Sequence, residues 1–121
     1  MYCLSLHENT LPIIKSLGYV PVGLGTNNFS DEWLTDKTGD NIAHKNKFYG
    51  EYSFHYWFWK NKLKINSNDW VGFCQKRRYW IKSESKDKNI SFENLNYHLL
   101  VEPEATWENY DSIICEPINV S

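Results

Sequence analysis

The sequence predicts a three-layer α/β domain with a mostly parallel sheet. Short runs of strand-forming residues alternate with helical patterns along the chain, which is typical of strands joined by helical crossovers. A nearly continuous apolar run at residues 69–74 has the composition of a strand buried on both faces. With 121 residues the chain can bury one core. We therefore expect residues 1–121 to form a single domain, short for a two-substrate enzyme.

The first segment predicts a strand, a helix and a second strand. Residues 2–6 are apolar strand formers, and the polar residues 7–10 that follow can cap a helix in which Pro12 occupies the first turn. Gly18 predicts the end of this helix, and residues 19–22 predict the second strand. Because Pro21 lacks a backbone donor, we expect this strand to be an edge strand or an irregular one.

Residues 47–62 predict the longest helix. Its aromatic residues recur every three or four positions and so share one face, which we expect to lie in the core; they are Tyr49, Tyr52, Tyr56 and Trp59. The run at 69–74 predicts a central strand, and residues 112–115 predict another buried strand. Residues 23–28 and much of 30–41 are rich in turn-forming residues, and in α/β proteins such loops at strand ends hold ligands.

Composition indicates which cellular compartment and which classes of partner to expect for this protein. The net charge of −2 argues against nucleic acid, whose binding needs a basic face. The cysteines Cys3, Cys74 and Cys115 are widely spaced within apolar runs, so we expect buried, reduced thiols in a cytoplasmic protein. No segment approaches the roughly 20 apolar residues of a transmembrane helix.

A cationic cluster follows the predicted central strand. Lys76, Arg77 and Arg78 stand at its carboxyl end, where open parallel sheets bind ligands. Guanidinium groups bind phosphate bidentately, and a neighbouring lysine adds a point charge that can stabilise a leaving diphosphate. Neighbouring side chains on an extended backbone point to opposite faces, so we expect one of the two arginines to reach a ligand. The alternative is a solvated loop whose cations pair with surface carboxylates, and spacing alone favours it.

Several polar residues near the long helix have two interpretations. Glu51 and His55 are four residues apart, which suits an acid–base pair or two metal ligands, although a structural role is commoner. Asp36, Asp40 and Asn41 can hold a ribose or a sugar hydroxyl, or only their own turn.

The motifs of dinucleotide oxidoreductases, P-loop NTPases, zinc peptidases and α/β-hydrolases do not occur, which weakens those assignments. Most of the six tryptophans occupy positions typical of a core, but Trp33 and Trp80 border polar loops and are better placed to contact a ligand.

Three segments carry a resemblance to a known family. They read GDNI..KN..Y.E....YW.WKN from Gly39, D.VGFC..RRYW from Asp69 and W..YDSIICEP from Trp107. In order and spacing they are similar to a family of bacterial domains of unknown function, whose members are commonly described as glycosyltransferases of capsular, exopolysaccharide or lipopolysaccharide biosynthesis. The resemblance covers most of the chain from Asp36 onward.

The resemblance implies a GT-A-like fold and a nucleotide-sugar-dependent transferase. Its matching positions are Gly39, Asp40, Asn41, Asn46, Tyr49, Glu51, Tyr56, Trp57, Trp59, Lys60, Asn61, Arg77, Arg78, Tyr79 and Asp111. From them, and from the residue chemistry above, we predict Glu51 and Asp111 as catalytic carboxylates. The predicted substrate-binding residues are Asp36, Asp40, Asn41, Asn46, Lys76, Arg77, Arg78 and Tyr79.

Two departures qualify this expectation. Gln75 and Lys76 stand where the family usually has His and Tyr, so a proton-transfer role for that histidine is missing. Family domains are also roughly twice as long, so we expect a shortened member in which acceptor-binding elements are absent.

The resemblance implies a nucleotide-sugar donor and a glycan or lipid-linked acceptor as partners. No Asp-x-Asp motif follows an apolar strand, so we assign no metal ligand. The cationic cluster can neutralise the diphosphate itself, and a Mn²⁺ or Mg²⁺ ion is the alternative. Two non-catalytic functions stay open: a module that only binds the nucleotide or sugar, and a structural fragment without a ligand.

Overall fold

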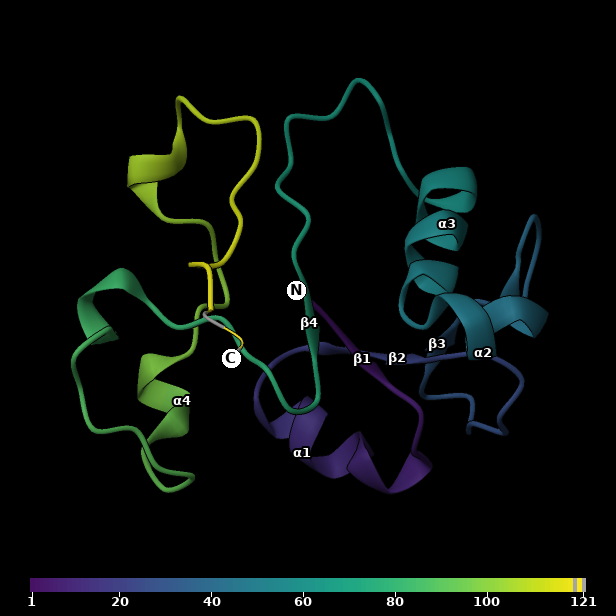
Figure 1. The fold of residues 1–121 in the computed structure, drawn as a ribbon, viewed down its shortest axis with the longest axis horizontal. Coiled ribbons are helices and arrows are strands. Elements are labelled where there is room, and N and C mark those ends of the chain that lie inside the picture. The colour runs from purple at the N-terminus through teal and green to yellow at the C-terminus, as the bar shows by residue number, and fades with distance from the viewer. Residues whose placement is uncertain (119, 121) are drawn as a thin grey trace. The chain divides into compact units, whose positions relative to one another are not determined.

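The computed structural model describes residues 1–118 and 120, which divide into two compact units, residues 1–79 and the described residues from Trp80 onward. In the first unit, four parallel strands form one sheet in the order β3-β2-β1-β4 (Figure 1). The strands are β1 (Tyr2–Ser5), β2 (Val20–Gly23), β3 (Leu34–Thr35) and β4 (Phe73–Gln75). The α/β fold with a parallel sheet is therefore confirmed.

Helices cover both faces of this sheet (Figure 1). After β1 the chain forms a 3₁₀ turn at Glu8–Thr10 and helix α1 (Leu11–Ser16). Between β3 and β4 it forms a 3₁₀ turn at Ala43–Lys45, helix α2 (Asn46–Tyr49) and helix α3 (Tyr52–Asn61).

The main core lies between the sheet and α3. Leu4 of β1 and Val22 of β2 pack with Phe54, Trp57 and Phe58 of α3. Phe73 of β4 joins this cluster, since its ring centroid lies 5.9 Å from that of Phe54 and 5.5 Å from that of Phe58. Because side chains alternate along a strand, Cys3 and Cys74 point to the opposite face. They are aligned across β1 and β4 and buried.

Two expectations about the strands are wrong. Pro21 does not mark an edge strand, because β2 lies between β3 and β1. The proline is tolerated there because β3 pairs only with Val22 and Gly23. The predicted central strand at 69–74 is shorter and shifted to Phe73–Gln75, and it lies at the edge of the described sheet. Trp70, expected to be buried, is 37% exposed.

The long helix predicted over residues 47–62 is interrupted at Gly50. This glycine has φ 56° and ψ −133°, a conformation that ends α2 and that other residues rarely adopt. The predicted aromatic core face is also wrong, since Tyr49, Tyr52 and Trp59 are more than half exposed. The buried face of α3 is instead formed by Ser53, Phe54, Trp57 and Phe58.

The second unit consists of short helices and turns. It contains 3₁₀ turns at Ser83–Ser85 and Ala105–Trp107 and the helix α4 (Leu95–His98). Leu99 and Leu100 are buried, and an antiparallel bridge joins Ile81 to Leu99. The strand predicted at 112–115 is not formed, because the segment is mostly exposed, with Ile114 at 83%. Cys115 is likewise exposed, contrary to expectation, whereas Cys3 and Cys74 are buried free thiols as predicted.

Candidate functional site

The sheet topology identifies where a ligand fits best. From β1 the chain adds β2 and then β3 on one side, and it then returns to place β4 on the other side of β1. The strand order therefore reverses between β1 and β4. In open parallel sheets, the crevice at the carboxyl ends of two such strands is the usual ligand site. Here those ends carry residues 5–7 and 75–78.

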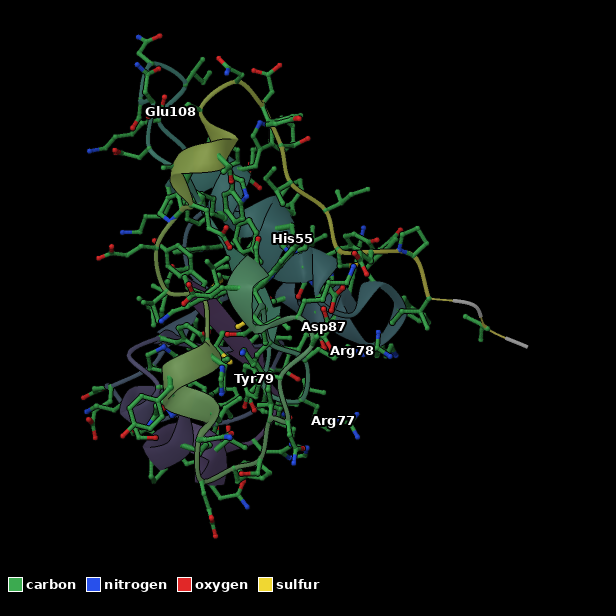
Figure 2. All side chains as sticks on the ribbon, turned by 90° about the vertical axis from the view of Figure 1, so that its left-hand side faces the viewer. His55, Arg77, Arg78, Tyr79, Asp87 and Glu108 are labelled. Atoms are coloured by element: carbon green, nitrogen blue, oxygen red, sulfur yellow. The ribbon has the colours of Figure 1, made fainter. Side chains whose placement is uncertain are left out.

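The predicted cationic cluster occupies one side of this switch point. After β4 the backbone reverses in a tight turn, in which the Gln75 and Arg78 backbones exchange N–H···O hydrogen bonds of 3.2 and 3.0 Å. Lys76 and Arg77 are the two central residues of the turn, and both arginines are exposed. Figure 2 shows Arg77 and Arg78 at this turn. The two guanidinium groups and the lysine ammonium thus follow directly from the carboxyl end of β4.

Tyr79 holds this turn in place. Its hydroxyl donates a hydrogen bond of 2.6 Å to the carbonyl oxygen of Lys76, and its ring lies 6.2 Å from that of Tyr19. Burial raises the pKa of Tyr79, with a smaller contribution from Cys3 and Cys74, so the hydroxyl stays protonated and remains a donor at neutral pH. Tyr79 was predicted to bind substrate, and in the structure its hydroxyl positions the backbone that carries the cations.

The other side of the switch point is a hydroxyl-lined turn after β1. The Ser5 hydroxyl oxygen accepts a hydrogen bond of 3.1 Å from the His7 N–H and lies 2.8 Å from the Thr10 hydroxyl. This network fixes the backbone around His7, an exposed residue that is not among the predicted site residues. The sequence feature that could have identified His7 is its position directly after the first predicted strand, residues 2–6. An imidazole here adds a hydrogen-bonding group at the same end of the sheet.

Asp36 and Asn46 organise the neighbouring loops from within. Asp36 follows β3 and is fully buried. Its carboxylate accepts hydrogen bonds of 3.0 Å from the Gly25 N–H and 2.5 Å from the Ser53 hydroxyl. The amide of Asn46 donates to the Ser53 hydroxyl oxygen at 2.8 Å and to the Gly50 carbonyl at 2.7 Å. The polar groups of Asp36 and Asn46, both predicted to bind a ligand, therefore stabilise the loops after β2 and β3 and the break before α3.

Asp40 and Asn41 form the polar turn before α2. The Tyr56 hydroxyl donates to the Asp40 carboxylate at 2.9 Å, and the Asn61 amide donates to the Asp40 carbonyl at 2.8 Å. Asn41 donates to the Lys37 and Gly39 carbonyls and accepts from the Ala43 N–H. Asp40 is exposed, so one of its carboxylate oxygens stays available, whereas Asn41 is committed to the turn.

Glu51 and His55 do not form a hydrogen-bonded acid–base pair in the structure. Glu51 is the N-cap of α3, and its carbonyl accepts the backbone N–H of His55 at 3.3 Å. The His55 ring (Figure 2) packs 4.8 Å from the Phe73 ring, and burial lowers its pKa although Glu51 opposes the shift. These observations favour a structural role for His55. Within residues 1–118 and 120, no three His, Cys, Asp or Glu side chains group as a metal site.

Asp111 belongs to the second compact unit and is exposed, whereas Glu51 belongs to the first. Trp33, expected near a ligand, is 6% exposed and packs 4.9 Å from the Phe29 ring, so it belongs to the interior. No helix in the described part of the chain has the length and apolar character needed to cross a membrane.

A family model covers almost the whole chain. The match extends over residues 2–120 and carries the description Domain of unknown function (DUF4422). The chain belongs to this family. No curated protein and no solved structure matches the chain.

For this DUF4422 member, the structure divides the predicted site residues into two groups. Asp36, Asn41, Asn46 and the Tyr79 hydroxyl are occupied by internal hydrogen bonds. Lys76, Arg77 and Arg78 follow the carboxyl end of β4 at the switch point, and both arginines are exposed. These cations belong to the turn of residues 75–78, which we call the cationic turn, and it is the part of the predicted site that lies at the switch point.

Proposed function

We propose that this chain binds the diphosphate of a nucleotide sugar at the cationic turn of residues 75–78 and is a glycosyltransferase of GT-A-like fold. The single observation that carries the proposal is the position of Lys76, Arg77 and Arg78 at the topological switch point of a parallel sheet. The motifs shared with glycosyltransferase-like bacterial domains support the assignment of the donor. The acceptor is a glycan or a lipid-linked sugar of surface polysaccharide biosynthesis.

The cations have a defined task in such a reaction. The bond between the anomeric carbon and the donor phosphate oxygen breaks, a bond to the acceptor oxygen forms, and the acceptor proton passes to a base. Negative charge accumulates on the departing nucleoside diphosphate. Preorganised cations that face this charge lower the barrier, and guanidinium forks bind two phosphate oxygens at once. Lys76, Arg77 and Arg78 supply these charges, and Tyr79 fixes the turn that carries them.

The proton acceptor is one of the two predicted carboxylates. Asp111 is exposed and Glu51 is half-buried at the start of α3, so each carboxylate is open to solvent, as a general base must be. A divalent cation such as Mn²⁺ or Mg²⁺, carried in by the diphosphate, would share the neutralising task with the three side chains.

Nucleotide binding tests the proposal directly. The purified chain is titrated with UDP, GDP, CMP and dTDP sugars, with and without Mn²⁺, and thermal stability is recorded because a ligand specific for the folded state raises it. We expect one nucleotide to give a selective shift. Arg77→Ala should weaken that nucleotide about 10- to 100-fold, the value of a lost charged hydrogen bond. Lys88→Ala, which removes an exposed cation of the second unit, is the matched control.

Failure of every nucleotide to stabilise the chain would contradict the proposal, as would an Arg77→Ala variant that binds like the parent. A second function is favoured by Gln75 and Lys76, which replace the His and Tyr usual at these positions. It is a module that binds the nucleotide sugar without turnover. Release of free sugar or transfer to an acceptor distinguishes the enzyme from this module, and a chain that binds no nucleotide would instead be a structural fragment.

A further inference from the structure

Helix α3 carries an aromatic face that the domain does not bury. Ser53, Phe54, Trp57 and Phe58 face the core, so residues on the opposite side of the helix point outward. Tyr52 and Trp59 on that side are 64% and 57% exposed, and Tyr56 lies between them, with its ring 5.9 Å from that of Trp59. We call Tyr52, Tyr56 and Trp59 the aromatic face.

Exposed aliphatic residues extend this face past the end of the helix. The backbone N–H groups of Lys62 and Leu63 both donate to the Phe58 carbonyl, so the chain continues the last helical turn. Leu63 is 46% exposed and Ile65 is 89% exposed. Isolated exposed apolar residues are ordinary, but an aromatic helix face followed by two exposed aliphatic side chains indicates an interaction surface.

Lysines surround these apolar side chains. Residues 44–65 contain five lysines and one glutamate, whereas the rest of the chain contains eight basic and fourteen acidic residues. The segment is therefore strongly positive within a chain of net charge −2. All five lysines are exposed, and the ion pairs found in the described residues involve other lysines, Lys15 and Lys86.

The lysines and rings contact one another directly. The Lys60 ammonium lies 3.9 Å from the Trp59 ring centroid and 5.8 Å from that of Tyr56, and the Lys47 ammonium lies 4.8 Å from that of Phe48. Such pairs place a charge at the edge of an apolar surface. Lysine side chains in this position can extend their charge towards water or phosphate while their methylene groups cover apolar neighbours.

We infer that the aromatic face of α3 and the following residues 60–65 dock the protein on an anionic lipid bilayer. Tyrosine and tryptophan favour the headgroup region, lysines are attracted to anionic headgroups, and apolar side chains such as Leu63 and Ile65 enter the acyl boundary. Leu63 and Ile65 argue against nucleic acid as the partner, because aliphatic side chains neither stack on bases nor pair with phosphate. The positive charge of this face argues against a dimer in which two copies of the chain pair through it, because the two faces would repel each other.

Vesicle binding tests this surface. The full chain is sedimented with vesicles of phosphatidylcholine alone and with vesicles containing phosphatidylglycerol, at low and high salt. We expect binding to the anionic vesicles at low salt, release at high salt, and little binding to the neutral ones. The double variant Lys62→Glu, Lys64→Glu should lower the partition coefficient by more than about 20-fold, since each lost lysine accounts for roughly fivefold.

Two further variants separate charge from apolar contact. Lys86→Glu with Lys88→Glu makes the same change in net charge outside residues 44–65 and should leave vesicle binding within about threefold of the parent, because neither lysine belongs to the surface inferred to contact the bilayer. Trp59→Ser should weaken binding without unfolding the chain, as circular dichroism can verify, because this ring is outside the core.

The inference is overturned if the parent chain does not bind anionic vesicles at low salt, or if the two double-lysine variants lose binding equally. A dimer in solution that Trp59→Ser dissociates would assign the face to a second copy instead. Nucleotide titrations are independent of these measurements, so loss of vesicle binding and loss of the nucleotide site are distinguishable.

Discussion

The carboxylate of Asp36 accepts a 2.5 Å hydrogen bond from the Ser53 hydroxyl, and both residues are completely buried. Asp36 follows β3 and Ser53 lies in the first turn of α3, so this bond joins the carboxyl end of the sheet to the helix that covers it. The same carboxylate accepts the Gly25 N–H from the loop after β2. One buried side chain thus ties together three segments at the edge of the sheet where the site lies.

Asp36→Ala should therefore destabilise the first unit. It leaves the Gly25 N–H and the Ser53 hydroxyl without their acceptor in a buried environment, and each such loss costs about 1–3 kcal/mol. We expect the free energy of unfolding, measured with urea, to fall by about 2–4 kcal/mol. Asp31→Ala, at an exposed carboxylate nearby, should change it by less than about 0.5 kcal/mol. Equal effects of the two substitutions would contradict a joining role for Asp36.

The pH dependence of stability gives a second test of Asp36. Burial raises its pKa above the ordinary 3.8, against the opposing effect of the hydrogen bonds from Ser53 and Gly25. As pH rises from 3.8 through the raised value, the unfolded chain loses this proton before the folded chain does. The contribution of Asp36 to the free energy of unfolding must then decrease across that window and stay constant above it.

Asp36→Asn removes this titration. We expect the free energy of unfolding of the parent, relative to the variant, to decline as pH rises above 3.8. Urea unfolding of both proteins at a series of pH values measures the difference. A difference that grows with pH would mean that the folded chain lowers the pKa of this group.

Local sequence signals predicted the first half of the fold. Gly18 ends a helix, as a glycine with φ 77° can, and the apolar runs on either side form neighbouring parallel strands. The cationic cluster was also placed correctly at the carboxyl end of a strand. Its position at the switch point could not be predicted, because strand order is a long-range property that only the assembled sheet defines.

The spacing of the aromatic residues did not identify the buried face of α3, because both faces of this helix are apolar. In α3 the aromatic rings at Tyr52 and Trp59 recur with helical spacing, but so do Phe54 and Trp57 on the other side. Periodicity shows that residues share a face and does not say which face meets the sheet. The internal hydrogen bonds of Asp36 and Asn46 could not be predicted for a related reason, since a polar loop residue can bind a ligand or a distant protein group equally well.

Tyr79→Phe should weaken nucleotide binding without abolishing it. The hydroxyl that donates to the Lys76 carbonyl is removed while the ring stays, so the cationic turn loses one restraint worth about 0.5–1.5 kcal/mol. We expect a decrease in nucleoside diphosphate affinity of roughly two- to tenfold, measured by calorimetry. Tyr97→Phe, at a 75% exposed ring, should leave affinity unchanged. If Tyr79→Phe lowers stability but not affinity, the turn does not position the ligand.

Gly50→Ala should lower the free energy of unfolding through backbone strain alone. Gly50 has φ 56° and ψ −133°, and a side-chain carbon added there would meet no atom within 4 Å. Strain in this region costs of order 1–3 kcal/mol for a residue other than glycine. The free energy of unfolding should fall by that amount, whereas Lys47→Ala in the adjoining α2 should have little effect. An unchanged stability would show that α2 and α3 are joined by a different backbone conformation.

Thiol labelling tests the pairing of β1 with β4. Cys3 and Cys74 are aligned across these strands and are 0% and 7% exposed, whereas Cys115 is exposed. The hydrogen bond between the two thiols raises the pKa of Cys74 and lowers the pKa of Cys3, so it is burial that should keep both from the reagent. In the folded chain an aromatic disulfide reagent should therefore modify one thiol rapidly and two at least about 100-fold more slowly, through opening of the sheet. Cys115→Ser should remove the rapid phase alone. Rapid labelling of the remaining two thiols in that variant would show that β1 and β4 do not bury them as neighbours.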